Sequence, residues 1–393
     1  MNNSVKSLVL FVLCPFVSFL TSVQNLRNKY NQIVFVLFFG LFGFCHTFKD
    51  TRADSYRKYE YFNGYSKTTI NDIYNEFSDG EIKDVYEEIL MNFVRSFSHN
   101  PKVMMMIVGL VGGFFYMLVV KRFLKDRLGN LTYPLVILLG FMIIESNLCV
   151  MGGLRNFTAF PIFMYSAIRL LLDKKKGWII GLIITPLIHF AYIPVVVAAI
   201  LVYLVSIPSK FLHYTAVTAC LLSIFLSTSS YSEMLEVGLG FIDNESISSR
   251  VDNYGDASTE DHFSQSLTTR LNRINNKISA CFVAMLLIFI RKNKNQLIKT
   301  EYEEKLYNLL LFFISISFAF IAFSVVGQRY VYIAMILLYM LLLNLYQKNK
   351  KLIKPYIYAM PLVYSIHILY FIYNCYSNVG IDILYKPLPF LLM

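Results

Sequence analysis

Two arginines at the ends of strongly apolar segments are the side chains of this sequence best placed to do chemistry. Arg155 lies in MGGLRNFTAF and Arg329 in VVGQRYVYIA, and the topology argued below puts both on the outer face of a membrane. Loop arginines normally gather on the cytoplasmic face, as the positive-inside rule describes. An arginine on the outer face therefore predicts binding of an anionic head group, because a planar guanidinium can contact two phosphate oxygens at once.

Two further residues near this face could take part in the same chemistry. Glu145, in LVILLGFMIIESNLCV, is an intramembrane carboxylate, which is costly unless it faces a wet cavity or a partner such as Ser146 or Asn147. His189 can contact a phosphate as a cation or a hydroxyl as a neutral base, or simply form an interhelical hydrogen bond beside Tyr192. We favour the phosphate contact, because nearby carboxylates remain to accept the proton of an attacking hydroxyl.

Hydrophilic segments on the same side contain the remaining candidates. Arg52 and Asp54 stand in FKDTRADSYRKY directly after a predicted span, where a solvated charge cluster is the alternative interpretation. Arg250 and Tyr254 stand in SSRVDNYGD, where a surface salt bridge with a neighbouring aspartate would equally explain the arginine. Each of these motifs is a weak signal by itself. They are candidates for one site because all of them are predicted on the outer side of the membrane.

Composition assigns the chain to the polytopic α-helical membrane proteins. Hydrophobic residues make up 56% of the 393 positions and charged residues 16%, and apolar runs of about 18 residues, long enough to cross a bilayer core, recur along the chain. The net charge of +11 could suggest a nucleic-acid partner. The basic residues, however, form short blocks between apolar runs, which predicts cytoplasmic anchors and no nucleic acid. These blocks are 121–127, 174–176, 291–299 and 347–354.

The apolar runs predict about twelve transmembrane helices. Ten runs can be read directly, at 5–23, 32–48, 103–120, 131–150, 155–172, 211–228, 272–290, 306–326, 330–346 and 352–373. The stretch 177–207 must cross twice, as two short helices broken near His189 and Pro194, if the flanking basic blocks are both cytoplasmic. Both termini then lie outside, and His189 shares the face of the two arginines. The first run lacks a cleavage site, so we expect it to be retained.

Two hydrophilic segments, 49–101 and 229–271, are too long to be ordinary connectors, and we expect both on the periplasmic side of a single transmembrane domain covering 1–393. In the first segment, EIKDVYEEILMNFVRSFSH repeats apolar residues at helical spacing from Val85 to Phe97. This pattern predicts an amphipathic helix that lies on a membrane or on the helix bundle. Together the two segments would form a lid over a cavity open to lipid.

The sequence contains no pattern for a metal or a cofactor. The six cysteines lie in or beside apolar segments without a CxxC pair, so we expect them to be packing residues. No DxD pair and no carboxylate–histidine cluster has ligand spacing, so we expect neither a metal site nor a cofactor.

The ordered set of these motifs resembles the EpsG-type polysaccharide polymerases, relatives of the Wzy O-antigen polymerases, over most of the chain. The residues that carry the resemblance are Arg52 and Asp54 with Tyr56 or Tyr59, Glu87-Glu88-Ile-Leu, Leu154-Arg155-Asn156, Ile188-His189-Phe190, the pair Arg250 and Tyr254, and Gln328-Arg329-Tyr330. The resemblance implies a GT-C-like membrane glycosyltransferase architecture. It also implies an inner-membrane location with the active site facing the periplasm.

The implied reaction transfers a glycan chain from one undecaprenyl diphosphate carrier to the terminal sugar hydroxyl of another lipid-linked repeat unit, without a metal. Substrate binding then falls to Arg52, Arg155, Asn156, Arg250, Tyr254 and Arg329, and proton transfer to Asp54, Glu88, Glu145 or His189. Arginines would take the place of a metal at the diphosphate leaving group. The expected partners are the lipid-linked oligosaccharide, membrane lipid and a chain-length regulator protein.

Three other functions stay open at this level. An O-antigen ligase performs the same leaving-group chemistry on a different acceptor. A flippase for the same lipid would be a transporter and no enzyme; inverted internal repeats would favour it, and none is evident. An acyltransferase would also suit an outer histidine and arginine, but no acyl-donor motif is evident.

Overall fold

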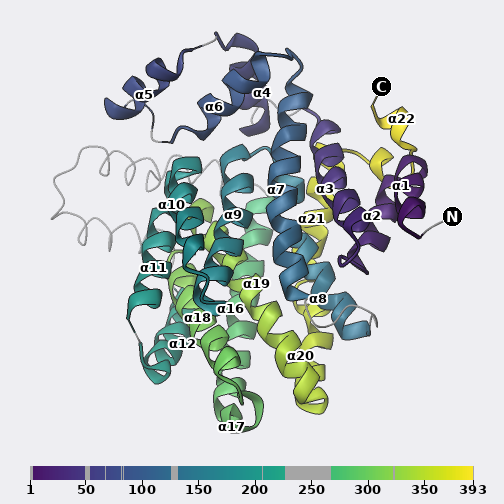
Figure 1. Ribbon diagram of the computed structural model, residues 1–393. Helices are drawn as coiled ribbons and strands as arrows, with labels where there is room; N and C mark the ends of the chain where they lie inside the picture. Colours follow the sequence, from purple (N-terminus) through teal and green to yellow (C-terminus); the bar gives the residue numbers. More distant parts are fainter. Residues whose placement is uncertain are drawn as a thin grey trace. The chain divides into compact units, whose positions relative to one another are not determined.

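The computed structural model describes residues 3–48, 54–66, 68–80, 82, 84–124, 132–205, 207–225, 267–321 and 324–392. Every regular element within these residues is a helix, in agreement with the fold class predicted from composition (Figure 1). Arg52, Arg250, Tyr254 and nearly all of the second hydrophilic segment lie outside the described residues. The roles expected for these three side chains therefore stay predictions.

The chain packs as two compact units, one formed by Met1–Leu204 with Phe371–Met393 and the other by Val205–Tyr370. The organisation as a single transmembrane domain stays a prediction. The helices of the first unit are α1 Asn3–Leu13, α2 Pro15–Val23, α3 Lys29–Phe44, α4 Asp54–Gly64, α5 Ile70–Ser78, α6 Tyr86–Arg95, α7 Pro101–Phe123, α8 Tyr133–Ile144, α9 Leu154–Ala167, α10 Ile179–Ile188, α11 Ile193–Leu204, the C-terminal part of α21 Ser365–Asn378, and α22 Leu388–Leu391.

The centre of the first unit is built on close packing of α3 against α7 and of α7 against α9. Glycines permit this approach. A Cβ atom on Gly43 would collide with the carbonyl oxygen of Met105, and one on Gly109 with that of Phe39. Small residues that bring two helix backbones together are a common device of membrane helices. The short helices α4, α5 and α6 lie across one end of this bundle (Figure 1), where α4 and α6 contact α7 and α6 also contacts α9 and α10.

Several predicted spans are interrupted in the structure. The run 5–23 forms α1 and α2, which break at Cys14 directly before Pro15. The run 131–150 forms α8 only as far as Ile144, and the chain then turns through Asn147, whose φ is +59°. The stretch 177–207 forms α10 and α11 with the break at His189, which confirms the two short helices predicted there.

The described residues of the second unit form a further set of helices. They are α12 Ser209–Phe225, α16 Leu267–Lys292, α17 Lys294–Leu297, α18 Glu301–Ala319, α19 Ser324–Lys348, α20 Lys350–Val363 and the start of α21. Helix α12 packs on α16 and α18, and α18 packs on α19. Between α12 and α18, His213 Nδ1 lies 3.0 Å from the Tyr307 hydroxyl in the buried interior.

Within each unit the basic blocks come together at one end. In the first unit Arg122 Nη2 and Arg169 Nη1 contact the Asp173 carboxylate at 2.6 and 2.7 Å, which joins the C-terminus of α7 to the segment before block 174–176. In the second unit Lys348 Nζ lies 2.6 Å from Glu303 Oε1 and Asn349 Nδ2 donates to the Gln296 carbonyl, so blocks 291–299 and 347–354 meet. If the basic blocks of one unit share a cytoplasmic face, they must lie at the same end of that unit, as they do here.

Length and composition identify three segments of the described residues that can cross a membrane, Pro101–Phe123, Arg273–Lys292 and Arg329–Lys348. The pair α20 and α21, bent by 50°, makes a fourth if it is one span. Other apolar helices are shorter: α10 has 10 residues and α11 has 12, and helices of that length cover only about half of a hydrocarbon core that is roughly 30 Å thick. The count of twelve spans stays a prediction.

The cysteine prediction was wrong for two residues. Cys149 and Cys375 form a disulfide whose Cα atoms are 4.7 Å apart and whose partners are 226 residues apart in sequence, while Cys14, Cys45, Cys220 and Cys281 are free. Cys149 follows α8 and Cys375 lies in the part of α21 that belongs to the first unit. The bond therefore ties the C-terminal segment to the main body of that unit, and packing alone does not account for these cysteines.

Candidate functional site

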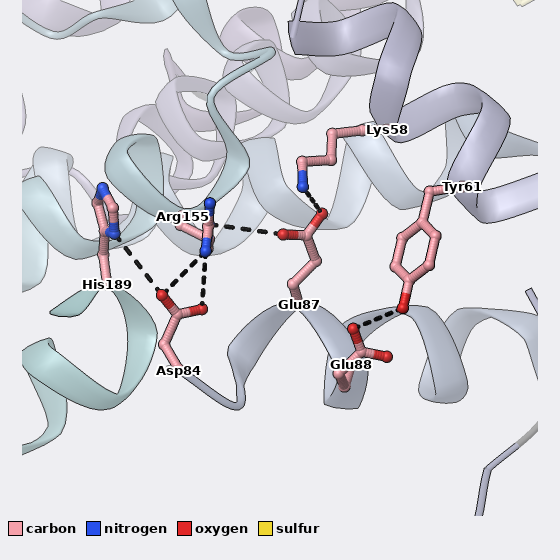
Figure 2. Close-up of polar contacts among 7 residues, drawn as sticks. All are labelled: Lys58, Tyr61, Asp84, Glu87, Glu88, Arg155 and His189. Atoms are coloured by element: carbon pink, nitrogen blue, oxygen red, sulfur yellow. Dashed lines mark hydrogen bonds and ion pairs between the residues drawn. The ribbon is translucent and has the colours of Figure 1, made fainter. Parts of the chain in front are cut away.

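Arg155 lies at the centre of a network of charged side chains drawn from separate segments (Figure 2). Its Nη1 contacts both oxygens of Asp84, at 3.3 Å to Oδ1 and 3.0 Å to Oδ2, and its Nε lies 3.5 Å from Glu87 Oε2. The Asp84 side chain is 1% exposed and that of Arg155 is 35% exposed. The aspartate is thus buried, while the arginine side chain is partly exposed to solvent.

The position of Arg155 follows from the start of α9. Two glycines precede Leu154, and Arg155 occupies the first turn of the helix. The next residue, Asn156, accepts a hydrogen bond of 3.0 Å from the Tyr192 hydroxyl, which anchors this turn to the segment just after His189. One turn further, Thr158 Oγ1 lies 2.9 Å from the Tyr86 hydroxyl. The arginine is therefore held between α6 and the break after α10.

The carboxylates of the network come from the segment that opens α6. The Val85 N–H donates to the Leu187 carbonyl over 3.2 Å, which fixes the backbone beside Asp84 against the end of α10. Glu87 and Glu88 stand in the first turn of α6, where negative charge is favourable to the helix dipole. Glu87 also lies on the stripe that α6 buries, three, four and seven residues before Leu90, Met91 and Val94. Burial on that stripe points its carboxylate into the protein.

The break between α10 and α11 brings His189 to the same network. The residue ends α10 with an extended backbone, φ −153° and ψ 107°, and its side chain is buried. Its Nδ1 lies 3.7 Å from Asp84 Oδ2, so Asp84 stands between the imidazole and the guanidinium (Figure 2). Asp84 thus connects His189 to Arg155, two residues that the sequence predicted on one face.

Helix α4 closes the other side of the network. Lys58 Nζ lies 2.5 Å from Glu87 Oε1, and the Tyr61 hydroxyl donates to Glu88 Oε1 over 2.8 Å (Figure 2). Partial burial and the hydrogen bond to Glu88 raise the pKa of Tyr61, so this phenol remains a donor at neutral pH. Glu88 is thus engaged as an acceptor.

Asp54 begins α4, and its side chain lies outside what the structure describes. Its neighbour Ser55 is buried and packs on Gly152, since a Cβ atom on that glycine would lie 2.8 Å from the Ser55 Cβ. The start of α4 therefore lies against the chain that leads into Arg155. This backbone placement keeps Asp54 a candidate for the same site.

Four charged side chains of the network balance one another. Asp84 and Glu87 face the cations of Arg155 and Lys58, and pairing of this kind offsets the cost of taking charges out of water. A guanidinium has five N–H donors. Among the described residues no acceptor engages Nη2 of Arg155. The arginine is therefore oriented by two carboxylates and retains donors for a further anion.

Glu145 and Arg329, two predicted site residues, are not among the seven side chains drawn in Figure 2. Glu145 ends α8 and is 2% exposed, so it is buried at a helix terminus, whereas the sequence placed it inside a longer span. Arg329 belongs to the second unit, where it stands early in α19 next to the buried Tyr330. In the described part of the chain, no group of three or more His, Cys, Asp or Glu side chains could hold a metal ion.

Sequence reasoning missed Asp84, Lys58, Glu87 and Tyr61 as members of the network. One signal was present for Glu87, because a carboxylate at i with apolar residues at i+3, i+4 and i+7 breaks the polarity of an amphipathic stripe. No local pattern marks Asp84, which lies in an irregular segment 71 residues before Arg155. Its role emerges only when α6 and α9 are packed together.

A comparison with protein families matches this chain to the EpsG family over residues 30–386, which is nearly its whole length. A search of curated proteins and a search of solved structures each gave no match. The match extends over most of both compact units and includes every residue of the network around Arg155.

Proposed function

The chain belongs to the EpsG family of Wzy-like polysaccharide polymerases, and we propose that it extends a surface glycan. In this reaction a glycan moves from one undecaprenyl diphosphate carrier to the terminal sugar hydroxyl of a second lipid-linked repeat unit. The bond between the anomeric carbon and the diphosphate oxygen breaks, and the acceptor oxygen forms the new glycosidic bond. The acceptor proton goes to a base on the protein, and the diphosphate leaves as an anion.

The single observation that carries this proposal is the orientation of Arg155. Its Nη1 and Nε contact Asp84 and Glu87, so the remaining donors have a fixed direction before substrate arrives. Fixed donors stabilise developing charge most effectively, because no reorganisation is needed during the reaction. We assign Arg155 to the diphosphate leaving group. Arg52, Arg250 and Arg329 supply further positive charge, and Asn156 and Tyr254 contact the substrate, as the family resemblance implies.

We assign the acceptor proton to His189, in place of the phosphate contact favoured from sequence. A carboxylate near Nδ1 favours a proton on that nitrogen, which makes Nε2 the basic atom, and it stabilises the imidazolium that forms. Asp84 is then a positioning residue for both Arg155 and His189. Glu88 already accepts a hydrogen bond from Tyr61, which argues against it as the base. Asp54 and Glu145 remain the alternatives to His189.

The proposed setting is the bacterial inner membrane, with about twelve spans, a GT-C-like architecture and the site open to the periplasm. The Cys149–Cys375 disulfide supports an outer position for the chain beside Arg155, because disulfides persist in oxidising compartments. The basic clusters around Asp173 and Glu303 suit the cytoplasmic face. A chain-length regulator protein is the proposed protein partner.

Surface glycan length in a strain lacking this chain tests the proposal. A polymerase loss leaves one repeat unit at the cell surface, and restoring the chain from a plasmid should restore the long ladder. Complete absence of glycan at the surface would indicate a ligase. Units retained on the cytoplasmic side would indicate a flippase.

A further inference from the structure

Helices α5 and α6 enclose an apolar groove beside the charged network. Its volume is about 550 Å³, within the range of pockets that take small molecules. Ile70, Ile73 and Phe77 of α5 line one wall. Val85, Ile89 and Phe93, from the start and body of α6, line the other. All of these residues belong to the first unit.

The groove leaves large apolar side chains uncovered. Ile70 is 80% exposed, Ile89 53% and Phe93 58%. Ile89 and Phe93 belong to the predicted amphipathic face but do not pack on the bundle, since α6 buries Leu90 and Val94 instead. Contiguous exposed apolar side chains mark a binding surface more often than isolated ones do.

The groove and the network of Arg155 are bordered by neighbouring residues of one stretch of chain. Val85 lines the groove, and the preceding residue, Asp84, contacts Arg155. One short stretch of chain thus borders both an apolar channel and an oriented cation. This combination fits an amphiphile whose anionic head lies at the arginine and whose hydrocarbon chain follows α5 and α6.

We propose that the α5–α6 groove holds the hydrocarbon chain of the polyprenyl diphosphate whose head binds Arg155. The inference rests on the proposed function, because that function supplies the lipid diphosphate. The general membrane surface is a poorer occupant. Helix α5 contains Asp72 and Glu76 and no lysine or arginine, whereas helices that lie on anionic bilayers present basic side chains.

Photocrosslinking of the purified full-length protein in nanodiscs tests the occupant. One sample receives a polyprenyl diphosphate with a photoreactive group in the isoprenyl chain, and a second contains a phospholipid with the same group in an acyl chain. We expect the polyprenyl probe to label peptides that contain residues 70–77 and 85–96, and unlabelled undecaprenyl diphosphate to suppress that labelling. Labelling elsewhere only, or phospholipid labelling of the groove that the competitor leaves unchanged, would overturn the proposal.

Substitutions separate the groove from the rest of the protein. Phe93→Ser and Ile89→Asn should each reduce competed labelling at least about tenfold, which corresponds to 1.4 kcal/mol of binding energy. Phe390→Ser is the matched control, because Phe390 has a similar exposure of 63% and lies in α22, away from the groove. Equal labelling in the groove variants and the control would refute the site. Because Phe93 and Ile89 are exposed, their variants should elute as folded protein.

The readout also separates this proposal from the polymerase proposal. Competed labelling of α5 and α6 in a protein that extends no glycan would refute the polymerase and support the groove. Glycan extension that depends on Arg155, combined with labelling that avoids α5 and α6, would refute the groove alone.

Discussion

Arg155 is a cation that the protein has already partly neutralised. Asp84 makes two contacts with the Arg155 guanidinium and Glu87 makes a third. A bound diphosphate would therefore meet a guanidinium that is already oriented and whose positive charge is partly offset. This arrangement gives direction to the remaining N–H donors, which a flexible arginine side chain would lack. Lysine has one nitrogen and cannot contact both carboxylates and a phosphate in the same geometry.

Replacement of Arg155 is the first prediction. Arg155→Ala should lower chain extension by about two orders of magnitude, as loss of one preorganised donor does elsewhere, and Arg155→Lys should recover little of it. Glycan ladders and immunoblots of the membrane fraction measure the effect and the protein level. Lys176→Ala, which removes an exposed cation from a cytoplasmic block, is the control and should keep long glycan. Wild-type ladders in Arg155→Ala would remove this residue from the site.

The pH dependence of chain extension is the second prediction. A histidine base works only when neutral, so wild-type activity should fall on the acid side as the imidazole becomes protonated. Asp84→Asn removes the anion 3.7 Å from Nδ1 that favours the imidazolium, so the acid-side fall should move to lower pH while the maximal rate drops. His189→Gln should lose that fall altogether and retain only weak activity. An unchanged profile in all three proteins would exclude His189 as the base.

At the scale of elements, a single carboxylate connects the end of α7 to the π-helical turn Ile168–Leu172. Arg122 reaches Asp173 through both Nε and Nη2, and Arg169 adds a contact from one turn earlier. Burial raises the pKa of Asp173, but Arg122 and Arg169 lower it by more, so the net shift is downward. A group whose pKa is depressed in the folded state stabilises that state above its unfolded pKa and loses this effect as pH falls.

Loss of this contact is the third prediction. Asp173→Asn should destabilise the protein in detergent at pH 7 by about 1 kcal/mol, a figure reduced for the partial exposure of the pair. The difference from wild type should shrink as pH falls through the depressed pKa of Asp173. Thermal unfolding at several pH values measures both effects. Asp382→Asn is the matched control: its exposed pair with Lys386 also lowers an aspartate pKa, but the loss at neutral pH should be smaller.

At the scale of the whole molecule, the chain returns to the unit in which it began. Residues 371–393 pack in the first unit, and α22 contacts α1. The disulfide between Cys149 and Cys375 fixes this return six residues before Arg155. The two cysteines are 226 residues apart in sequence. Closing a loop of this length restricts the unfolded chain and so stabilises the fold.

The state of the thiols is the fourth prediction. Denatured protein taken from cells should react with a maleimide polymer at four of its six cysteines before reduction and at six after it. Each added polymer gives one countable step on a gel. Cys375→Ser should release Cys149 and give five reactive thiols without reduction. Six reactive thiols in unreduced wild type would place the pair in a reducing compartment and contradict the proposed orientation.

Insensitivity to chelation is the fifth prediction. If arginines stabilise the leaving diphosphate, chain extension by purified protein in nanodiscs should continue in excess EDTA. The measurement is glycan length with time, and a metal-dependent glycosyltransferase assayed in the same buffer is the control. Activity that returns only on addition of magnesium or manganese would show that a metal, and not arginine alone, stabilises the diphosphate.

Much of this architecture could be predicted from local sequence. Apolar runs and basic blocks specify helices and their ends, because burial in lipid requires satisfied backbone groups within each segment. The same logic located the break near His189 and Pro194, because the basic blocks on either side of 177–207 require this stretch to cross the membrane twice. The spacing of apolar residues by itself predicts α6. These features depend on neighbours within a few turns of the chain.

Only the tertiary structure decided which side chains meet. Asp84 reaches Arg155 across 71 residues, and Cys149 reaches Cys375 across 226. It also decided that Leu90 packs inward while Phe93 lines an open groove, although both belong to one predicted apolar face. Periodicity describes a segment by its own polarity, whereas these contacts depend on how distant segments pack together. The sequence by itself therefore determined a helical membrane protein and its arginines, and packing determined the carboxylates that orient one of those arginines.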